Sequence, residues 1–176
     1  MQRHELEHLI RAAGAITGTD EIIVIGSQAI LGAVPNAPAT LLRSSEADLF
    51  TLRDPKDADL IDGSIGEGSP FHETFGYYAQ GVWEDTAVLP YGWKDRLVDI
   101  CNENTRHVVA RCLEPHDLAV SKLVAGREKD IEFLQEMVCY QMLDLEVMQD
   151  RIQSLPENAA VGVDLQQRWK RISSKA

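Results

Sequence analysis

The chain has 176 residues, a length that fits one domain able to bury roughly two-thirds of its unfolded surface. It carries 17 Lys and Arg against 28 Asp and Glu, and this formal net charge of −11 repels nucleic acid at long range and weighs against a broad surface that tracks nucleic-acid phosphates. No stretch approaches the roughly 18 apolar residues of a membrane span, and the amino terminus lacks the apolar segment of a signal peptide. Cys101, Cys112 and Cys139 have no metal-binding spacing, so we expect buried thiols in a reducing, cytoplasmic location.

The first part of the chain predicts a helix followed by a buried strand. Residues 2–15 place apolar side chains on one helical face, so we expect this helix to cover one side of a sheet. Residues 21–25, EIIVI, are apolar without alternation, which is typical of a central strand buried on both faces. Gly26 and Ser27 then turn into a short helix, with Ser27 as its expected cap.

Further strands follow a two-proline loop at residues 34–39. We predict a helix capped by Asp54 with Pro55 at its first position, because this pair is typical of a helix start. Tyr77 and Tyr78 point to opposite faces of their strand, so that one packs in the core while the other is free to stack on a base. The predicted strands are residues 46–52, 77–82, 86–89, 97–101 and 106–112.

From Pro115 the chain is helical by pattern, with helices predicted at residues 115–138, 144–155 and 164–172. The predicted fold is therefore α+β, with a mixed sheet core flanked by helices. We expect residues 1–114 to form that core and residues 115–176 to form a helical segment packed on it as one unit.

Two carboxylates, Glu46 and Asp48, lie at alternate positions of one predicted strand. Residues two apart on a strand point to the same face, so the two like charges are neighbours. One interpretation is a solvated strand face, where water screens the repulsion. The other is a divalent cation between them, because Mg²⁺ prefers one or two carboxylates together with phosphate oxygens and water.

The Gly26-Ser27 turn favours the second interpretation. A buried strand that ends in Gly-Ser and opens into a helix exposes backbone N–H groups and a hydroxyl, which together suit a phosphate. Glycine lets that phosphate approach the backbone closely. An ordinary strand-to-helix turn remains the alternative.

Three stretches carry a family resemblance: VIGSQAILG, SEADLF and, later, LEPHDLAVSKLVAGREKDIEFL. The first two resemble the Gly-Ser and acid-x-acid signature of the DNA polymerase β-like nucleotidyltransferase superfamily. The third is similar to the helical motif of its small AbiEii-like and MenT-like branch, many of whose members are toxins in bacterial toxin–antitoxin and phage-defence systems. The chain also resembles an uncharacterised bacterial nucleotidyltransferase-like family of about this length. The resemblance covers residues 21–134 and implies a nucleotidyltransferase-like sheet core.

The resemblance implies a role for each motif residue in the sheet. Gly26 and Ser27 would hold the β- and γ-phosphates of a nucleoside triphosphate. Glu46 and Asp48 would ligate Mg²⁺ and act in catalysis.

In the helical motif, the resemblance implies that Lys122 and Arg127 contact phosphate and that Lys122 and Asp130 act in catalysis. Asp130 would either complete the acidic cluster or orient those two basic residues. The residues' own chemistry leaves other interpretations open, since Lys122 fits a side chain that snorkels from an apolar surface and Arg127 with Asp130 fits a surface ion pair. Gly126 marks either a break in the helix or a close approach by another backbone or a ligand.

The sequence departs from the family pattern at the acidic cluster. Glu46 stands where most relatives have Asp, and the gap between Gly26 and Glu46 is longer than in the shortest members. A third carboxylate is not fixed by the pattern, and its candidates are Asp62, Glu84 and Asp99.

These observations predict an Mg²⁺-dependent nucleotidyltransferase that moves a nucleoside monophosphate from a nucleoside triphosphate to an RNA or protein acceptor. The charge of −11 weighs against a large RNA footprint, although residues 168–175 are locally basic. One alternative is a catalytically degenerate module that binds a nucleotide or protein. Another is an antitoxin-like protein whose acidic surface masks a cognate partner.

Overall fold

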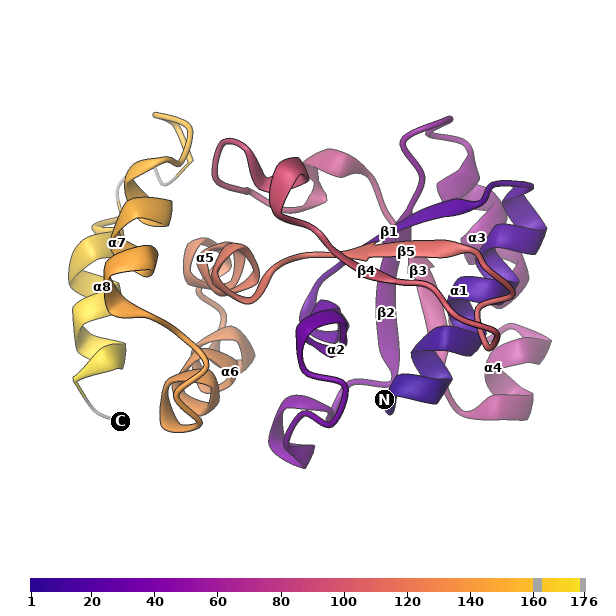
Figure 1. The fold of residues 1–176 in the computed structure, drawn as a ribbon, viewed down its shortest axis with the longest axis horizontal. Helices are drawn as coiled ribbons and strands as arrows, with labels where there is room; N and C mark the ends of the chain where they lie inside the picture. Colours follow the sequence, from indigo (N-terminus) through magenta and orange to yellow (C-terminus); the bar gives the residue numbers. More distant parts are fainter. Residues whose placement is uncertain (160–162, 175–176) are drawn as a thin grey trace.

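The computed structural model describes residues 1–159 and 163–174 and contains a mixed five-stranded sheet with helices on both sides (Figure 1). The α+β class is thus confirmed. The strand order across the sheet is β3-β2-β1-β5-β4. The strands are β1 (Glu21–Ile25), β2 (Glu46–Phe50), β3 (Tyr78–Gly81), β4 (Val98–Ile100) and β5 (Val109–Cys112).

The central strand β1 is buried on both faces of the sheet. Ile22, Ile23 and Val24 of β1 are fully buried, as the unbroken apolar run predicts. β1 pairs antiparallel with β2 and parallel with β5, while β2 pairs parallel with β3. This register sets Ile25 opposite Asp48, so the end of β1 lies beside the predicted carboxylate strand.

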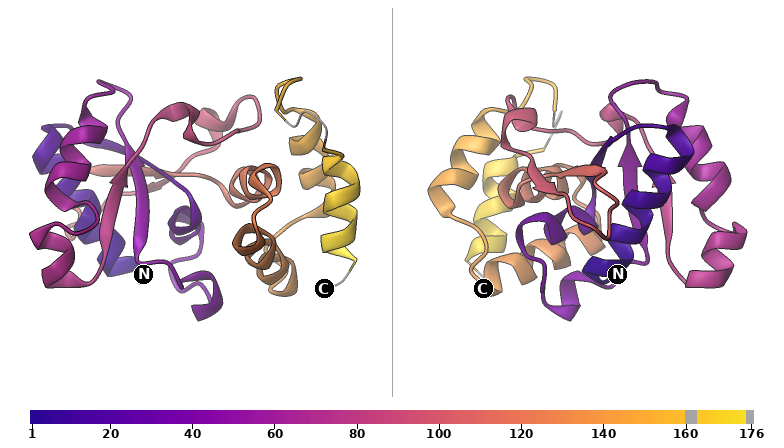
Figure 2. Two further views of the ribbon diagram at one scale, coloured as in Figure 1. Left: turned by 180° about the vertical axis from the view of Figure 1, so that it is seen from behind. Right: turned by 45° about the vertical axis from the view of Figure 1, so that its right-hand side comes forward.

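The helices form layers on either side of the sheet (Figures 1 and 2). One side is covered by α1 (Arg3–Thr17) and α3 (Asp57–Ile65), with α4 (Pro70–Phe75) beside α3. On the other side lie α2 (Ile30–Ala33), then α5 (Pro115–Ala125) and α6 (Glu128–Cys139), and outermost α7 (Leu145–Gln153) and α8 (Leu165–Ser173). Among the described residues, no helix combines the length and apolar character that crossing a membrane requires.

Three predicted local structures in the first 114 residues are wrong. Residues 86–89 are not a strand, because the Thr86 hydroxyl accepts the Trp83 N–H and the Thr86 N–H donates to the Trp83 carbonyl, closing a tight turn. Gly26, rather than Ser27, is the N-cap of a 3₁₀ turn at Ser27–Ala29. The helix expected at Asp54 begins at Asp57, since the Asp57 N–H donates to the Asp54 carbonyl in a lead-in turn.

The long helix predicted at residues 115–138 is two helices, α5 and α6, separated at Gly126. Gly126 adopts the left-handed conformation with φ of 61° and donates its N–H to the Lys122 carbonyl, which ends α5. A Cβ at Gly126 would lie 2.1 Å from Nη1 of Arg168 on α8. The expected break is therefore confirmed, whereas the group that approaches Gly126 is the Arg168 side chain and neither a backbone nor a ligand.

The cysteine prediction is correct for one residue of three. Cys112 on β5 is fully buried, and burial raises the pKa of its thiol to about 12. Cys101 and Cys139 are exposed, because each stands at the end of a secondary-structure element instead of within the core.

Candidate active site

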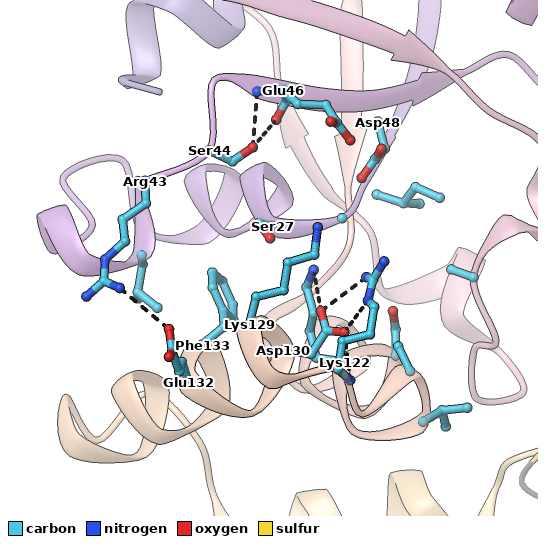
Figure 3. A pocket seen from close by; sticks show the side chains of 18 of the residues that line it. Ser27, Arg43, Ser44, Glu46, Asp48, Lys122, Lys129, Asp130, Glu132 and Phe133 are labelled. Atoms are coloured by element: carbon cyan, nitrogen blue, oxygen red, sulfur yellow. Dashed lines mark hydrogen bonds and ion pairs between the residues drawn. The ribbon is translucent and has the colours of Figure 1, made fainter.

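A cavity of about 870 Å³ lies between the sheet and helices α5 and α6 (Figure 3). Its walls come from the end of β1, from β2 and β3, and from the α5–α6 junction. All of the predicted site residues line it: Gly26, Ser27, Glu46, Asp48, Lys122, Arg127 and Asp130. The fold thus brings together motif residues that are about 100 positions apart in the chain.

Glu46 and Asp48 lie side by side on the cavity face of β2 (Figure 3). The Tyr78 hydroxyl of β3 donates a hydrogen bond to Oε2 of Glu46 at 2.9 Å, which fixes one carboxylate. Gly26 fits against the other, because a Cβ at this position would lie 1.8 Å from Oδ2 of Asp48. Gly26 also has a φ of 67°, a conformation that side chains rarely adopt. The glycine is therefore required by the carboxylate strand, whatever its role toward a phosphate.

Electrostatics make this carboxylate pair unusual. Burial and then the charge of Glu46 raise the pKa of Asp48 from 3.8 to about 7, although Lys122 and Lys129 act to lower it. Burial and then the hydrogen bond to Glu46 raise the pKa of Tyr78 to about 12, so Tyr78 stays a donor. Two adjacent oxygen ligands whose repulsion is not offset by the surrounding bases fit a divalent cation such as Mg²⁺.

The opposite wall is basic and is organised by one buried carboxylate. Asp130 is 1% exposed; its oxygens lie 3.2 Å from Nζ of Lys122 and 2.6 Å from Nε of Arg127. Burial acts to raise the pKa of Asp130, but the hydrogen bond from Arg127 and the charge of Lys122 hold it below its ordinary value. Of the two expectations for Asp130, these contacts correspond to orienting the basic residues.

Two further basic residues of the cavity were not predicted. Lys129 extends from the first turn of α6 into the cavity toward Ser27 (Figure 3), and its charge partly opposes the rise in the pKa of Asp48. Arg43 lies across the cavity from α6 (Figure 3), and its guanidinium pairs with the carboxylate of Glu132 at 3.6 Å. The signal for Lys129 is its place between the two members of the Arg127–Asp130 pair, whereas Arg43 precedes the carboxylate strand with no helical or strand pattern to orient it.

None of the three candidates for a third carboxylate, Asp62, Glu84 and Asp99, is among the described residues that line this cavity. Asp62 accepts the Gly81 N–H at 2.8 Å from α3, and Asp99 lies on β4, separated from β2 by β1 and β5. Over the described residues, His, Cys, Asp and Glu form no group of three that would hold a metal. A Mg²⁺ ion at this site would therefore have two carboxylate ligands and would take its other oxygens from phosphate and water.

The strand beside Asp48 carries an amide at the matching position. β2 and β3 run parallel, and their register sets Gln80 opposite Asp48. Gln80 is exposed and lines the same cavity. Its amide carbonyl is thus a candidate on the neighbouring strand for a further, neutral oxygen.

Comparison with known families agrees with this arrangement. Residues 4–175 match the family model described as "Nucleotidyltransferase of unknown function (DUF6036)". The chain belongs to this nucleotidyltransferase family. No curated protein and no solved structure matches the chain.

Proposed function

We propose that this family member is an Mg²⁺-dependent nucleotidyltransferase that transfers a nucleoside monophosphate from a nucleoside triphosphate to a hydroxyl of an RNA or protein acceptor. The observation that carries the proposal is the cavity itself, in which a repelling carboxylate pair faces the basic residues Lys122, Arg127 and Lys129. An anchored triphosphate with its metal needs both walls. The carboxylates hold the cation, and the basic residues offset phosphate charge.

The chain's own residues supply most of the proposed mechanism. The N–H groups at Gly26 and Ser27 and the Ser27 hydroxyl would bind the β- and γ-phosphates, and Glu46 with Asp48 would hold Mg²⁺. When bound, Mg²⁺ supplies charge neutralisation to the α-phosphate.

The transfer step is an in-line displacement at the α-phosphorus. The acceptor hydroxyl oxygen forms a bond to the α-phosphorus while the bond from that phosphorus to the bridging oxygen breaks. One carboxylate of the pair accepts the hydroxyl proton, and pyrophosphate leaves. Lys122 and Arg127 offset the charge that develops on pyrophosphate, and Asp130 keeps both side chains in place.

The biological setting is part of the same proposal. Resemblance of the α5–α6 segment to the AbiEii-like and MenT-like branch supports a bacterial, cytoplasmic protein of a toxin–antitoxin or phage-defence system, with a cognate partner protein. The net charge of −11 fits a basic partner.

A second candidate is a degenerate module that binds a nucleotide or a protein without transfer. It is favoured by the neutral Gln80, which lies in register with Asp48 on the strand where a third carboxylate would complete the cluster. Glu46 in place of the more common Asp points in the same direction.

The test is transfer of label from each α-labelled nucleoside triphosphate, with Mg²⁺, to total RNA or total protein. Asp48→Asn removes the central charge with little change of shape, and Asp150→Asn on exposed α7 is the matched control. Transfer by wild type and by the control, but not by Asp48→Asn, would support the enzyme. Mg²⁺-dependent nucleotide binding without transfer, measured by calorimetry with both acceptor pools present, would favour the second candidate. Absence of nucleotide binding would refute the enzyme and the nucleotide-binding form of the second candidate.

A further inference from the structure

A second cavity, of about 730 Å³, adjoins the proposed active site, and we name it the apolar groove. The two cavities have Val82, Ala87 and Val88 in common as wall residues. Phe50, in the groove, lies two residues after Asp48 on the same face of β2, a separation of about 7 Å along a strand. A chain held in the groove would thus lie within one or two side-chain lengths of the carboxylate pair.

The groove presents large apolar side chains to solvent. Trp83 is 52% exposed and Leu52 is 49% exposed, and Trp93 lies in the same wall. Ala87, Val88 and Leu89, which were expected in a strand, line the same groove outside the sheet. Contiguous exposed apolar surface of this kind marks a binding site more often than a random surface does.

The charged residues around the groove indicate which kind of molecule it binds. The described residues that line the groove include the acids Asp54, Glu84 and Asp85 but neither Lys nor Arg. Of these three acids, Glu84 makes an ion pair in the described structure, with Lys94 at 2.6 Å. An acidic rim repels a phosphate backbone and attracts Lys and Arg side chains, in contrast to the basic wall of the first cavity.

We propose that the apolar groove is the acceptor site, and that it binds a polypeptide segment in which aromatic or aliphatic side chains alternate with Lys or Arg. Docking there delivers a Ser, Thr or Tyr hydroxyl to the carboxylate pair. Binding of the segment stands on the groove alone, while delivery of the hydroxyl rests on the proposed function. The inference narrows the acceptor from RNA or protein to protein.

The test uses a fluorescent peptide array in which a central Tyr, Ser or Thr is flanked by mixed Leu, Phe, Lys and Arg. Binding is measured by anisotropy without nucleotide or Mg²⁺, beside peptides with Glu for Lys and Arg and an oligoribonucleotide of equal length. We expect the apolar-basic peptides to bind best and to change the tryptophan fluorescence, because two of the three tryptophans line the groove. Trp83→Glu should weaken this binding by at least about tenfold, as loss of an aromatic anchor does.

Two further variants make the result specific. Leu52→Glu repeats the test at a second exposed groove residue, and Tyr91→Glu is the matched control, since Tyr91 is 69% exposed and does not line the groove. Equal binding of the acidic peptides or of the oligoribonucleotide would overturn the proposal, as would unchanged binding by both Trp83→Glu and Leu52→Glu.

Transfer assays separate this inference from the proposed function. Peptides that bind but receive no label from any Mg²⁺-nucleotide would leave the groove as a docking site and refute the transfer. Label on RNA alone would leave the transferase standing and refute the acceptor site.

Discussion

Replacing Asp48 by Asn should stabilise the protein near neutral pH, although it removes a residue of the proposed active site. The pKa of Asp48 is raised from 3.8 to about 7, first by burial and then by the charge of Glu46. Between these two values the folded state binds a proton that the unfolded state has lost, so stability falls as the pH rises. The ionised side chain is therefore a destabilising group above pH 7, and Asn has no charge to bury.

The size of the effect follows from the same shift. Over the two pH units from about pH 5 to about pH 7, the free energy of unfolding of the wild type would fall by about 2.7 kcal/mol, at about 1.36 kcal/mol per pH unit. Asp48 is partly exposed within the cavity, and solvent screening reduces this value. We expect the difference in free energy of unfolding between Asp48→Asn and wild type to shift in favour of the variant by about 1–2 kcal/mol between about pH 5 and about pH 8.

Urea unfolding of wild type, Asp48→Asn and Asp150→Asn at the two pH values measures this difference directly. Adding Mg²⁺ near pH 8 should stabilise the wild type, by about 1.4 kcal/mol at ten times the dissociation constant, and should leave Asp48→Asn unaffected. The gain should shrink near pH 5, where the metal must displace a proton. A pH-independent difference between the two proteins would refute the electrostatic argument, and equal Mg²⁺ stabilisation of both would refute the metal site.

Three other substitutions test the surroundings of the pair. Gly26→Ala should cost about 1–3 kcal/mol in urea unfolding and abolish Mg²⁺-dependent nucleotide binding in calorimetry, because the new Cβ would displace the carboxylate of Asp48; normal binding would refute this. Tyr78→Phe should cost about 0.5–1.5 kcal/mol and weaken Mg²⁺ binding several-fold, since Glu46 loses its hydrogen bond; an unchanged Mg²⁺ titration would show that Glu46 needs no support. Asp130→Asn should cost about 3 kcal/mol near pH 8 by leaving a buried lysine unpaired, and the cost should shrink as the pH falls through the lowered pKa of Asp130; a cost that is constant with pH would contradict the ion pair.

The strands that carry the site were predictable because burial and alternation fix them locally. β1 is apolar at each position that both sheet faces require, and β2 alternates carboxylates with Ala47 and Leu49, which are buried. The failed strand at residues 86–89 has the same β-type composition, but a side-chain hydrogen bond within the turn at Trp83 and Thr86 overrides it. Composition thus identified the strands that pair in the sheet, but it did not reveal the local hydrogen bond that favours a turn over a strand.

The membership of the site was predictable, but most of its contacts were not. Spacing identified the carboxylate pair and the basic motif, and the cavity contains every one of those residues. Spacing gave no indication that Tyr78 would hold Glu46, because that bond depends on the parallel register of β2 and β3, which pairs strands 32 residues apart. The spacing likewise did not predict a role for Gln80, because its place beside Asp48 follows from the same register.

The break at Gly126 decides how the basic wall forms. In one continuous helix, Lys122 and Asp130 would be eight residues apart, about 12 Å along the axis, and unable to form an ion pair. The left-handed turn at Gly126 folds α6 back against α5, which brings Nζ of Lys122 to 3.2 Å from Asp130 and leaves Arg127 at the N-cap of α6 to bind the same carboxylate. Arg168 of α8 fills the space that a side chain at Gly126 would take and donates to the Leu123 carbonyl, so the outermost helix layer supports the bend. The geometry of the proposed phosphate site thus depends on α8, a helix that does not line the site. The sequence of the α5–α6 motif alone could not predict this dependence.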